Sequence, residues 1–358
     1  MAAETVTTYR VGMIGCGVMG LDHGEAYQAH PDTALVACAD PDAENLNVFA
    51  DRFGIPQGSR YANYQDLLAQ ERLDLVGIVT PVSVTPGAVQ ASAEAGVRGI
   101  FAEKPIAASL AEADQMIEAC RQRNIPLAVG AIWRNHPYMQ TAAQLLREGE
   151  LGLVLTVNCL GLGDELSGGG CHSFNVMRLL AGADVDWVIG VMASDQRARS
   201  DNDLAGGGYL HFANGVEGFI QHRTGPRRGI EVAGEWGTCF WDWQNLHLWK
   251  TASPWAAGND YRALQPAPFP YPPLRWPRIY PGITGGLQSL LDCVGRGDGG
   301  EPLTSGHDMR AVLEIAIALR ESHRRGHVAV HLPLEDRSLR IIPRPLRWQG
   351  RKASGELV

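Results

Sequence analysis

The chain has 358 residues, of which 45% are hydrophobic and 20% are charged, and its formal net charge at pH 7 is -8. This length favours two domains over one, and the composition is typical of a globular protein. The negative charge argues against nucleic acid or an anionic membrane surface as a partner, which leaves a small molecule as the expected one.

Between residues 9 and 130, short β-branched runs alternate with helical periods, which is typical of a parallel sheet with crossover helices. The predicted strands are 10–14, 34–39, 73–80, 99–102 and 126–130, and the predicted helices are 18–28, 43–53, 64–69, 86–95 and 110–123. Residues 1–130 are therefore predicted to form a doubly wound Rossmann domain.

Strand patterns dominate after residue 130. We expect a helix over 137–148, strands over 153–160, 187–193, 207–212, 216–223, 229–236 and 239–250, and a closing helix over 307–324. This pattern predicts a second α/β domain in residues 131–358, with a mixed and largely antiparallel sheet.

Residues 254–281 hold eight of the 21 prolines. Such a segment is expected to be neither a helix nor a central strand, so we predict a long loop. This loop either lies on the protein surface without a specific role, or it acts as a lid or as an arm in a subunit interface.

Seven scattered cysteines without a CxxC pair favour reduced thiols over disulfides or structural zinc, and we expect no metal site. No apolar run approaches the roughly 20 residues that span a bilayer, and no signal-peptide pattern precedes the first predicted strand. We expect a cytoplasmic protein with no membrane partner.

Gly15, Gly17 and Gly20 form a GxGxxG pattern. With 42 glycines in the chain, chance alone would produce this pattern about 0.6 times, so its context must carry the argument. The pattern follows a predicted strand and opens a predicted helix, where backbone N–H groups and the positive helix end can hold a pyrophosphate.

Asp40 ends the second predicted strand, 25 residues after Gly15. A carboxylate there can accept hydrogen bonds from an adenosine ribose diol and would repel a 2'-phosphate. Since no Arg or Lys follows Asp40 directly, we expect NAD as the cofactor rather than NADP.

Several further segments resemble landmarks of the glucose-fructose oxidoreductase and inositol dehydrogenase (Gfo/Idh/MocA) family. They are VGIVTP (76–81), FAEKP (101–105), AVGAIWRNHPYM (128–139), GGGCHSFNVMRLLAG (168–182) and IEVAGEWGTCFW (230–241). The resemblance spans most of residues 10–325. It implies a Rossmann domain joined to an open-faced sheet domain, with a sugar-like substrate bound between them over the nicotinamide. Residues 131–358 would then be the substrate-binding and oligomerisation domain.

The resemblance implies that Lys104 and His172 are the catalytic residues. The cofactor contacts that it implies are Gly15, Gly17, Val18, Met19, Gly20, Asp40, Thr80, Pro81, Glu103 and Lys104. The expected substrate contacts are Trp133, Arg134, Asp164 and Asn175, of which Trp133 and Arg134 follow the last Rossmann strand.

The chain departs from the family pattern at the acid four residues before His172, which is Gly168 here, and at Asn175, where the family often has Asp. Asp164 and Glu165 lie just upstream. The glycine run 168–170 would let the chain fold one of their carboxylates back toward the missing position.

Alcohol oxidation requires removal of the hydroxyl proton by a base with a pKa near the working pH. An unperturbed His, with a pKa of about 6.5, suits that role, and an unperturbed Lys, at about 10.4, is better placed as a donor. We therefore assign the base to His172 and the polarising donor to Lys104. The competing interpretations are a core histidine and a solvated strand-end lysine.

Trp241 and Trp243 are two residues apart, so both rings are expected on one sheet face, at a subunit interface rather than in the core. We therefore expect a homo-oligomer, either a dimer or a tetramer. The cluster of His222, Arg223, Arg227 and Arg228 is either a solvated turn or a pocket for an anionic group.

Three functions remain open. The first is an NAD(H)-dependent oxidoreductase acting on a secondary hydroxyl or ketone of a sugar, sugar derivative or cyclitol. The second is a redox-neutral NAD-dependent glycoside hydrolase of the same fold, and the third is a non-catalytic NAD-binding regulator. The presence of both Lys104 and His172 favours an enzyme.

Overall fold

The computed structural model describes residues 8–251, 264–268 and 281–344. These residues form two compact units, of which the first contains 8–132 and 281–310 and the second contains 133–251, 264–268 and 311–343. All residues after 130 are predicted to belong to the second domain, but helix α9 (Pro281–Arg296) belongs to the first unit. The apolar face of α9, with Ile283, Leu287 and Leu290, is buried in the core of that unit.

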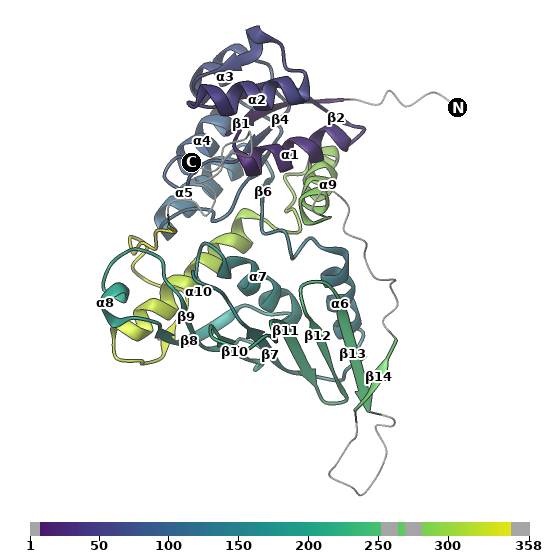
Figure 1. Ribbon diagram of the computed structural model, residues 1–358, viewed down its shortest axis with the longest axis vertical. Helices are drawn as coiled ribbons and strands as arrows, with labels where there is room; N and C mark the ends of the chain where they lie inside the picture. Colours follow the sequence, from purple (N-terminus) through teal and green to yellow (C-terminus); the bar gives the residue numbers. More distant parts are fainter. Residues whose placement is uncertain (1–7, 252–263, 269–280, 345–358) are drawn as a thin grey trace, which may run out of the picture. The chain divides into compact units, whose positions relative to one another are not determined.

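The first unit is a parallel six-stranded sheet covered by helices (Figure 1). Its elements are β1 (Tyr9–Ile14), α1 (Val18–Ala29), β2 (Thr33–Ala39), α2 (Ala43–Phe53), the 3-10 turn η1 (Gln57–Ser59), β3 (Arg60–Tyr61), α3 (Tyr64–Gln70), β4 (Leu75–Ile78), α4 (Thr85–Glu94), β5 (Gly99–Ala102), α5 (Leu110–Arg121), β6 (Leu127–Val129) and α9. The strand order is β3-β2-β1-β4-β5-β6, with every pair parallel. The predicted doubly wound fold is confirmed.

Local sequence explains these elements well. Strands β4, β5 and β6 are buried along their whole length, as expected for parallel strands covered on both faces. Helix α2 begins where the Asp42 side chain accepts from the backbone N–H groups of Glu44 and Asn45. Helix α5 begins at a capping box formed by Ser109 and Glu112.

The second unit contains a nine-stranded mixed sheet. Its elements are α6 (Pro137–Arg147), β7 (Val154–Leu160), α7 (Gly170–Ala181), β8 (Val185–Met192), α8 (Asp195–Ala198), β9 (Gly206–Phe212), β10 (Glu217–Gln221), β11 (Gly229–Gly234), β12 (Gly237–Trp241), β13 (Leu246–Thr251), β14 (Leu264–Ala267) and β15 (Val330–His331), and most of α10 (Gly306–Arg324) belongs to it. The strand order is β14-β13-β12-β11-β7-β10-β9-β8-β15. The pair β7 and β10 is parallel and the other pairs are antiparallel, so the predicted mixed sheet is confirmed.

Two predicted segments differ in the structure. The single strand predicted over 239–250 is a hairpin of β12 and β13, because Asp242 accepts from the N–H groups of Gln244 and Asn245 and so closes a turn. The predicted loop 254–281 contains the short strand β14, which pairs with β13 at the edge of the sheet, where a proline is tolerated. The rest of that loop, 254–263 and 269–280, lies outside the described residues.

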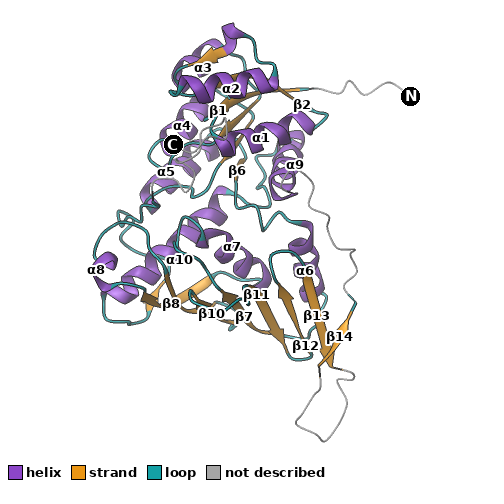
Figure 2. Cartoon of the chain, viewed as in Figure 1, coloured by secondary structure: helices purple, strands orange, loops and turns teal. Residues whose placement is uncertain are grey.

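The described helices of the second unit lie on one side of its sheet (Figure 2). Two aromatic residues of that sheet differ in exposure: Trp241 of β12 is buried, with 1% exposed, whereas Phe219 of β10 is 41% exposed. The prediction that the Trp241 ring forms a subunit interface is therefore wrong, because Trp241 is packed inside its own unit.

Within the described residues, no helix combines the length and hydropathy that crossing a bilayer requires.

Candidate dinucleotide and substrate sites

The predicted cofactor residues of the first unit share one edge of its sheet. They follow the carboxyl ends of β1, β2, β4 and β5, which are neighbouring parallel strands. The strand order reverses direction between β1 and β4, and ligands of open α/β sheets bind at such a point. The N–H of Val79 donates to the carbonyl of Ile14 at 2.7 Å, so the two strand ends are in contact.

Each glycine of the turn after β1 has a distinct steric role. Gly15 has φ 94°, and a Cβ there would lie 2.1 Å from the carbonyl oxygen of Val79. A Cβ on Gly20 would lie 2.5 Å from the carbonyl oxygen of Gly15, so α1 packs directly on the turn. A Cβ on Gly17 would meet nothing within 4 Å. Gly15 and Gly20 therefore shape the turn, and Gly17 leaves open space beside it.

The start of α1 fits a pyrophosphate. Gly17 is its N-cap residue and makes no side-chain cap, and the first turn, which contains Val18 and Met19, has no acidic residue. Backbone N–H groups at an uncapped helix N-terminus attract an anion. The residues present therefore fit the phosphate part of a dinucleotide.

Asp40 is buried at the end of β2, with 9% of its surface exposed. One of its oxygens accepts from the N–H of Cys16 at 2.7 Å, and the other accepts from the N–H of Asp42 at 2.8 Å. Burial raises the pKa of Asp40, and these two backbone hydrogen bonds oppose that shift. A carboxylate has about four acceptor positions, so Asp40 can support the glycine turn and still accept from a ribose diol.

The ends of β4 and β5 carry the remaining predicted cofactor residues. Thr80 places its hydroxyl 2.9 Å from that of Thr85, at the start of α4, and Pro81 is exposed. Glu103 is buried, Lys104 is half-buried, and the Lys104–Pro105 peptide bond is cis.

Sequence reasoning missed a partner of Glu103. Its Oε1 lies 3.1 Å from Nε2 of His23, a fully buried residue of α1. No local pattern marks this pair, because 80 residues separate the two side chains.

His172, the predicted base, lies in the first turn of α7 in the second unit and is half-buried. Asn175 is one turn further along α7 and fully buried, and its Oδ1 accepts from Nη1 of Arg134 at 3.1 Å. The structure thus brings Arg134, from the turn before α6, into contact with Asn175, on the helix that carries His172. Arg134 and Asn175 are two of the four predicted substrate residues.

The two acidic residues upstream of Gly168 differ sharply in solvent exposure. Asp164 is exposed, whereas Glu165 is 5% exposed. A Cβ on Gly168 would lie 2.5 Å from Oε2 of Glu165. The Glu165 carboxylate therefore occupies the space in which a side chain at position 168 would begin.

Asp203, which the sequence analysis did not single out, holds the turn before α7. It is fully buried, and its two oxygens accept from the N–H groups of Leu166, Ser167 and Gly168 and from the Ser167 hydroxyl, at 2.7 to 2.8 Å. These four bonds fix the backbone that follows Glu165. A single Asp, 35 residues from Gly168, leaves no spacing pattern that could have revealed this role.

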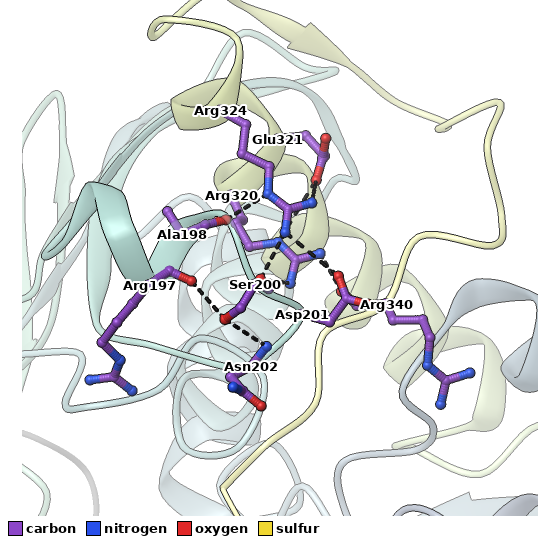
Figure 3. Close-up of polar contacts among 9 residues, drawn as sticks. All are labelled: Arg197, Ala198, Ser200, Asp201, Asn202, Arg320, Glu321, Arg324 and Arg340. Carbon is purple, nitrogen blue, oxygen red and sulfur yellow. Dashed lines mark hydrogen bonds and ion pairs between the residues drawn. The ribbon is translucent and has the colours of Figure 1, made fainter.

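Arginines of α10 in turn hold the segment that leads to Asp203 (Figure 3). Arg324 donates to the carbonyls of Ala198 and Ser200, at 2.6 and 2.7 Å, and Arg320 donates to those of Ser200 and Arg340. Burial lowers the pKa of Arg320 to about 10. The network anchors the loop after α8 to α10.

Trp133 belongs to an aromatic cluster. Its ring centroid lies 4.9 Å from that of Trp241 and 5.9 Å from that of Trp243, and His136 is close by. Burial lowers the pKa of His136 to about 4, so its ring is neutral at pH 7. The cluster explains why Trp241 is buried.

The basic turn at 222–228 is largely exposed. Arg227 forms an ion pair with Glu231 at 2.5 Å and lies 4.6 Å from the ring centroid of Phe240. These contacts favour a solvated turn over an anion pocket.

All seven cysteines are buried thiols, and no group of three potential ligands among the described residues is arranged to hold a metal ion.

The parallel sheet, the glycine turn and Asp40 define a dinucleotide-binding protein of the Rossmann class. Residues 9–131 match the model of a family described as an oxidoreductase family with an NAD-binding Rossmann fold (Gfo/Idh/MocA). The chain therefore carries the NAD-binding domain of that family, and the resemblance found in the sequence is confirmed.

Similar proteins match the chain beyond this domain as well. D-apiose dehydrogenase from Paraburkholderia graminis is 27% identical in an alignment 358 positions long, which covers 92% of each chain. Myo-inositol 2-dehydrogenase from Thermotoga maritima is 24% identical over 253 residues, covering 65% of this chain and 75% of that one. The structure of levoglucosan dehydrogenase in complex with NADH and levoglucosan matches with a TM-score of 0.75 at 22% identity, over 92% of this chain and 100% of the other. This last likeness establishes the fold.

Proposed function

We propose that this protein is an NAD(H)-dependent oxidoreductase that transfers a hydride to or from a secondary carbon of a sugar, sugar derivative or cyclitol. One observation carries the proposal: the glycine turn, Asp40 and Lys104 follow neighbouring strands at one edge of the parallel sheet. The names of the relatives support a sugar or cyclitol as the substrate.

Bound NAD supplies the hydride acceptor. In the direction of oxidation, His172 takes the proton of the reacting hydroxyl, and the Lys104 ammonium group donates a hydrogen bond to the same oxygen. Trp133 and Arg134 contribute an aromatic face and a cation for recognition, and Asn175 holds Arg134. We also propose that the protein is a homo-oligomer, either a dimer or a tetramer.

A panel of aldoses, ketoses, cyclitols and glycosides tests the function. Incubation with NAD should produce NADH absorbance with at least one free sugar or cyclitol. Release of an aglycone without net NADH would instead favour the glycoside hydrolase. The absence of both reactions, with NAD still bound, would favour the regulator.

We expect NAD(H) to bind at least about tenfold more tightly than NADP(H), or ~1.4 kcal/mol, because the Asp40 carboxylate repels a 2'-phosphate. Asp40→Ser should narrow this ratio in a fluorescence titration. The quantity to compare is the ratio of the NADP(H) and NAD(H) dissociation constants. The affinity for both cofactors should fall in this variant, because Asp40 also accepts a hydrogen bond from Cys16. Asp42→Ser is the matched control, because it removes a nearby charge and preserves a good N-cap for α2. Equal affinities in the unmodified protein would refute this role of Asp40.

We further propose that Glu165, rather than Asp164, replaces the acid that the family carries at position 168. Burial of Glu165 against Gly168 supports this choice. Glu165→Gln should lower kcat about tenfold, because it removes the carboxylate that takes the place of the family acid upstream of His172. Asp164→Asn, the exposed control, should change kcat less than about threefold. Steady-state kinetics on the best sugar substrate decides between them, and a larger effect at Asp164 would reverse the assignment.

A further inference from the structure

A buried contact links helix α1 to the strand end that carries Lys104. His23 lies in the middle of α1 and is 0% exposed, and its ring packs against Phe101 of β5 at a centroid distance of 4.9 Å. Its Nε2 lies 3.1 Å from Oε1 of Glu103. Since an ionised carboxylate only accepts, the hydrogen of this bond belongs to Nε2 of His23.

The second oxygen of Glu103 returns to its own main chain. Oε2 accepts from the backbone N–H of Lys104 at 3.0 Å. Glu103 is 6% exposed, and a buried carboxylate is costly unless its oxygens are hydrogen-bonded. The His23 bond therefore helps to determine where the Glu103 side chain lies, and the Glu103 side chain determines the orientation of the Lys104 peptide.

The end of β6 leaves the space that this arrangement needs. A Cβ on Gly130 would lie 2.5 Å from Oε1 of Glu103. Any other residue at position 130 would push the carboxylate away from His23. Three elements, α1 and the ends of β5 and β6, thus converge on one carboxylate.

We propose that His23 is a positioning residue for Lys104. It holds Glu103, which fixes the peptide from which the Lys104 side chain extends, and so directs the ammonium group toward the reacting oxygen. Because α1 also begins at the glycine turn, the same helix that receives the pyrophosphate sets the position of the donor. This inference rests on the function proposed above.

Two substitutions of similar size separate positioning from packing. His23→Leu fills the cavity and removes the donor, whereas His23→Gln keeps an N–H donor near the position of Nε2. Tyr27→Phe is the matched control, since Tyr27 lies one turn further along α1, is 1% exposed, and its hydroxyl has no hydrogen-bond partner among the described residues. All three variants change the buried side of one helix.

Hydrogen exchange of the Lys104 backbone amide measures, without any substrate, whether His23 holds the Lys104 peptide through Glu103. In His23→Leu we expect this amide to exchange about tenfold faster. On the sugar substrate its kcat should fall about tenfold, while the Kd for NADH stays within about threefold. His23→Gln should restore most of the protection and of kcat, and Tyr27→Phe should match the unmodified protein in every readout.

Unchanged exchange at Lys104 in His23→Leu would overturn the proposal, and so would equal losses in the Leu and Gln variants. If His23→Leu does not fold, Glu103→Gln provides the same test, because an amide has one acceptor oxygen where the carboxylate uses two. Failure of the proposed function is a separate result, in which the unmodified protein oxidises no sugar. The exchange measurement still decides whether His23 holds the Lys104 peptide.

Discussion

Lys104→Ala and His172→Ala should each lower kcat on a sugar substrate by about a hundredfold or more, which corresponds to ~2.7 kcal/mol in the barrier. In the proposed mechanism, each substitution removes a group that donates to, or takes a proton from, the reacting oxygen. Neither touches the glycine turn or Asp40, so the Kd for NADH should change only a few fold. Binding and chemistry should therefore separate in paired titration and steady-state experiments.

Lys250→Ala and His331→Ala are the matched controls for this pair. Lys250 forms a surface ion pair with Glu150, and His331 is exposed on β15. Both controls should retain turnover within about twofold, because an exposed ion pair contributes little and His331 has no part in the proposed mechanism. If Lys104→Ala and His172→Ala behave like these controls in every tested reaction, the catalytic assignment is wrong and a regulatory protein that binds NAD becomes the better account.

Asp203→Ala should lower the free energy of unfolding by about 3 kcal/mol or more, because it leaves several buried N–H groups without an acceptor. The affected groups belong to the turn 166–168, which follows Glu165 and leads into α7. We therefore expect turnover to fall as well, through displacement of Glu165 and His172. Urea unfolding followed by tryptophan fluorescence measures the first effect.

Asp201→Ala is the control for Asp203. Asp201 is two residues away, and its exposed carboxylate lies 3.6 Å from Arg324. Its loss should change stability by less than about 1 kcal/mol. A similar loss in both variants would show that the buried hydrogen bonds of Asp203 do not stabilise the turn.

Most of the fold could be predicted from local patterns. Apolar strands bounded by turn residues, and helices with recognisable starts, placed nearly every element of residues 9–130 within a few positions of the structure. The glycine turn was predicted in the same way, because its strand, turn and helix are adjacent in sequence. The errors arose where local patterns are ambiguous. Apolar and polar residues alternate through most of 239–250, so the pattern does not show where the hairpin turns, and the proline-rich segment conceals the edge strand β14.

The sequence by itself determined the class of each element, the parallel sheet of the first unit and the residues at its carboxyl edge, because these depend on periodicity and on neighbours along the chain. Only the tertiary structure decided that α9 joins the first unit, that His23 holds Glu103, and that Asp203 holds the turn before α7. Buried charged groups are stable only beside partners that satisfy them. Since those partners lie 35 to 80 residues away in the chain, no local pattern could identify them.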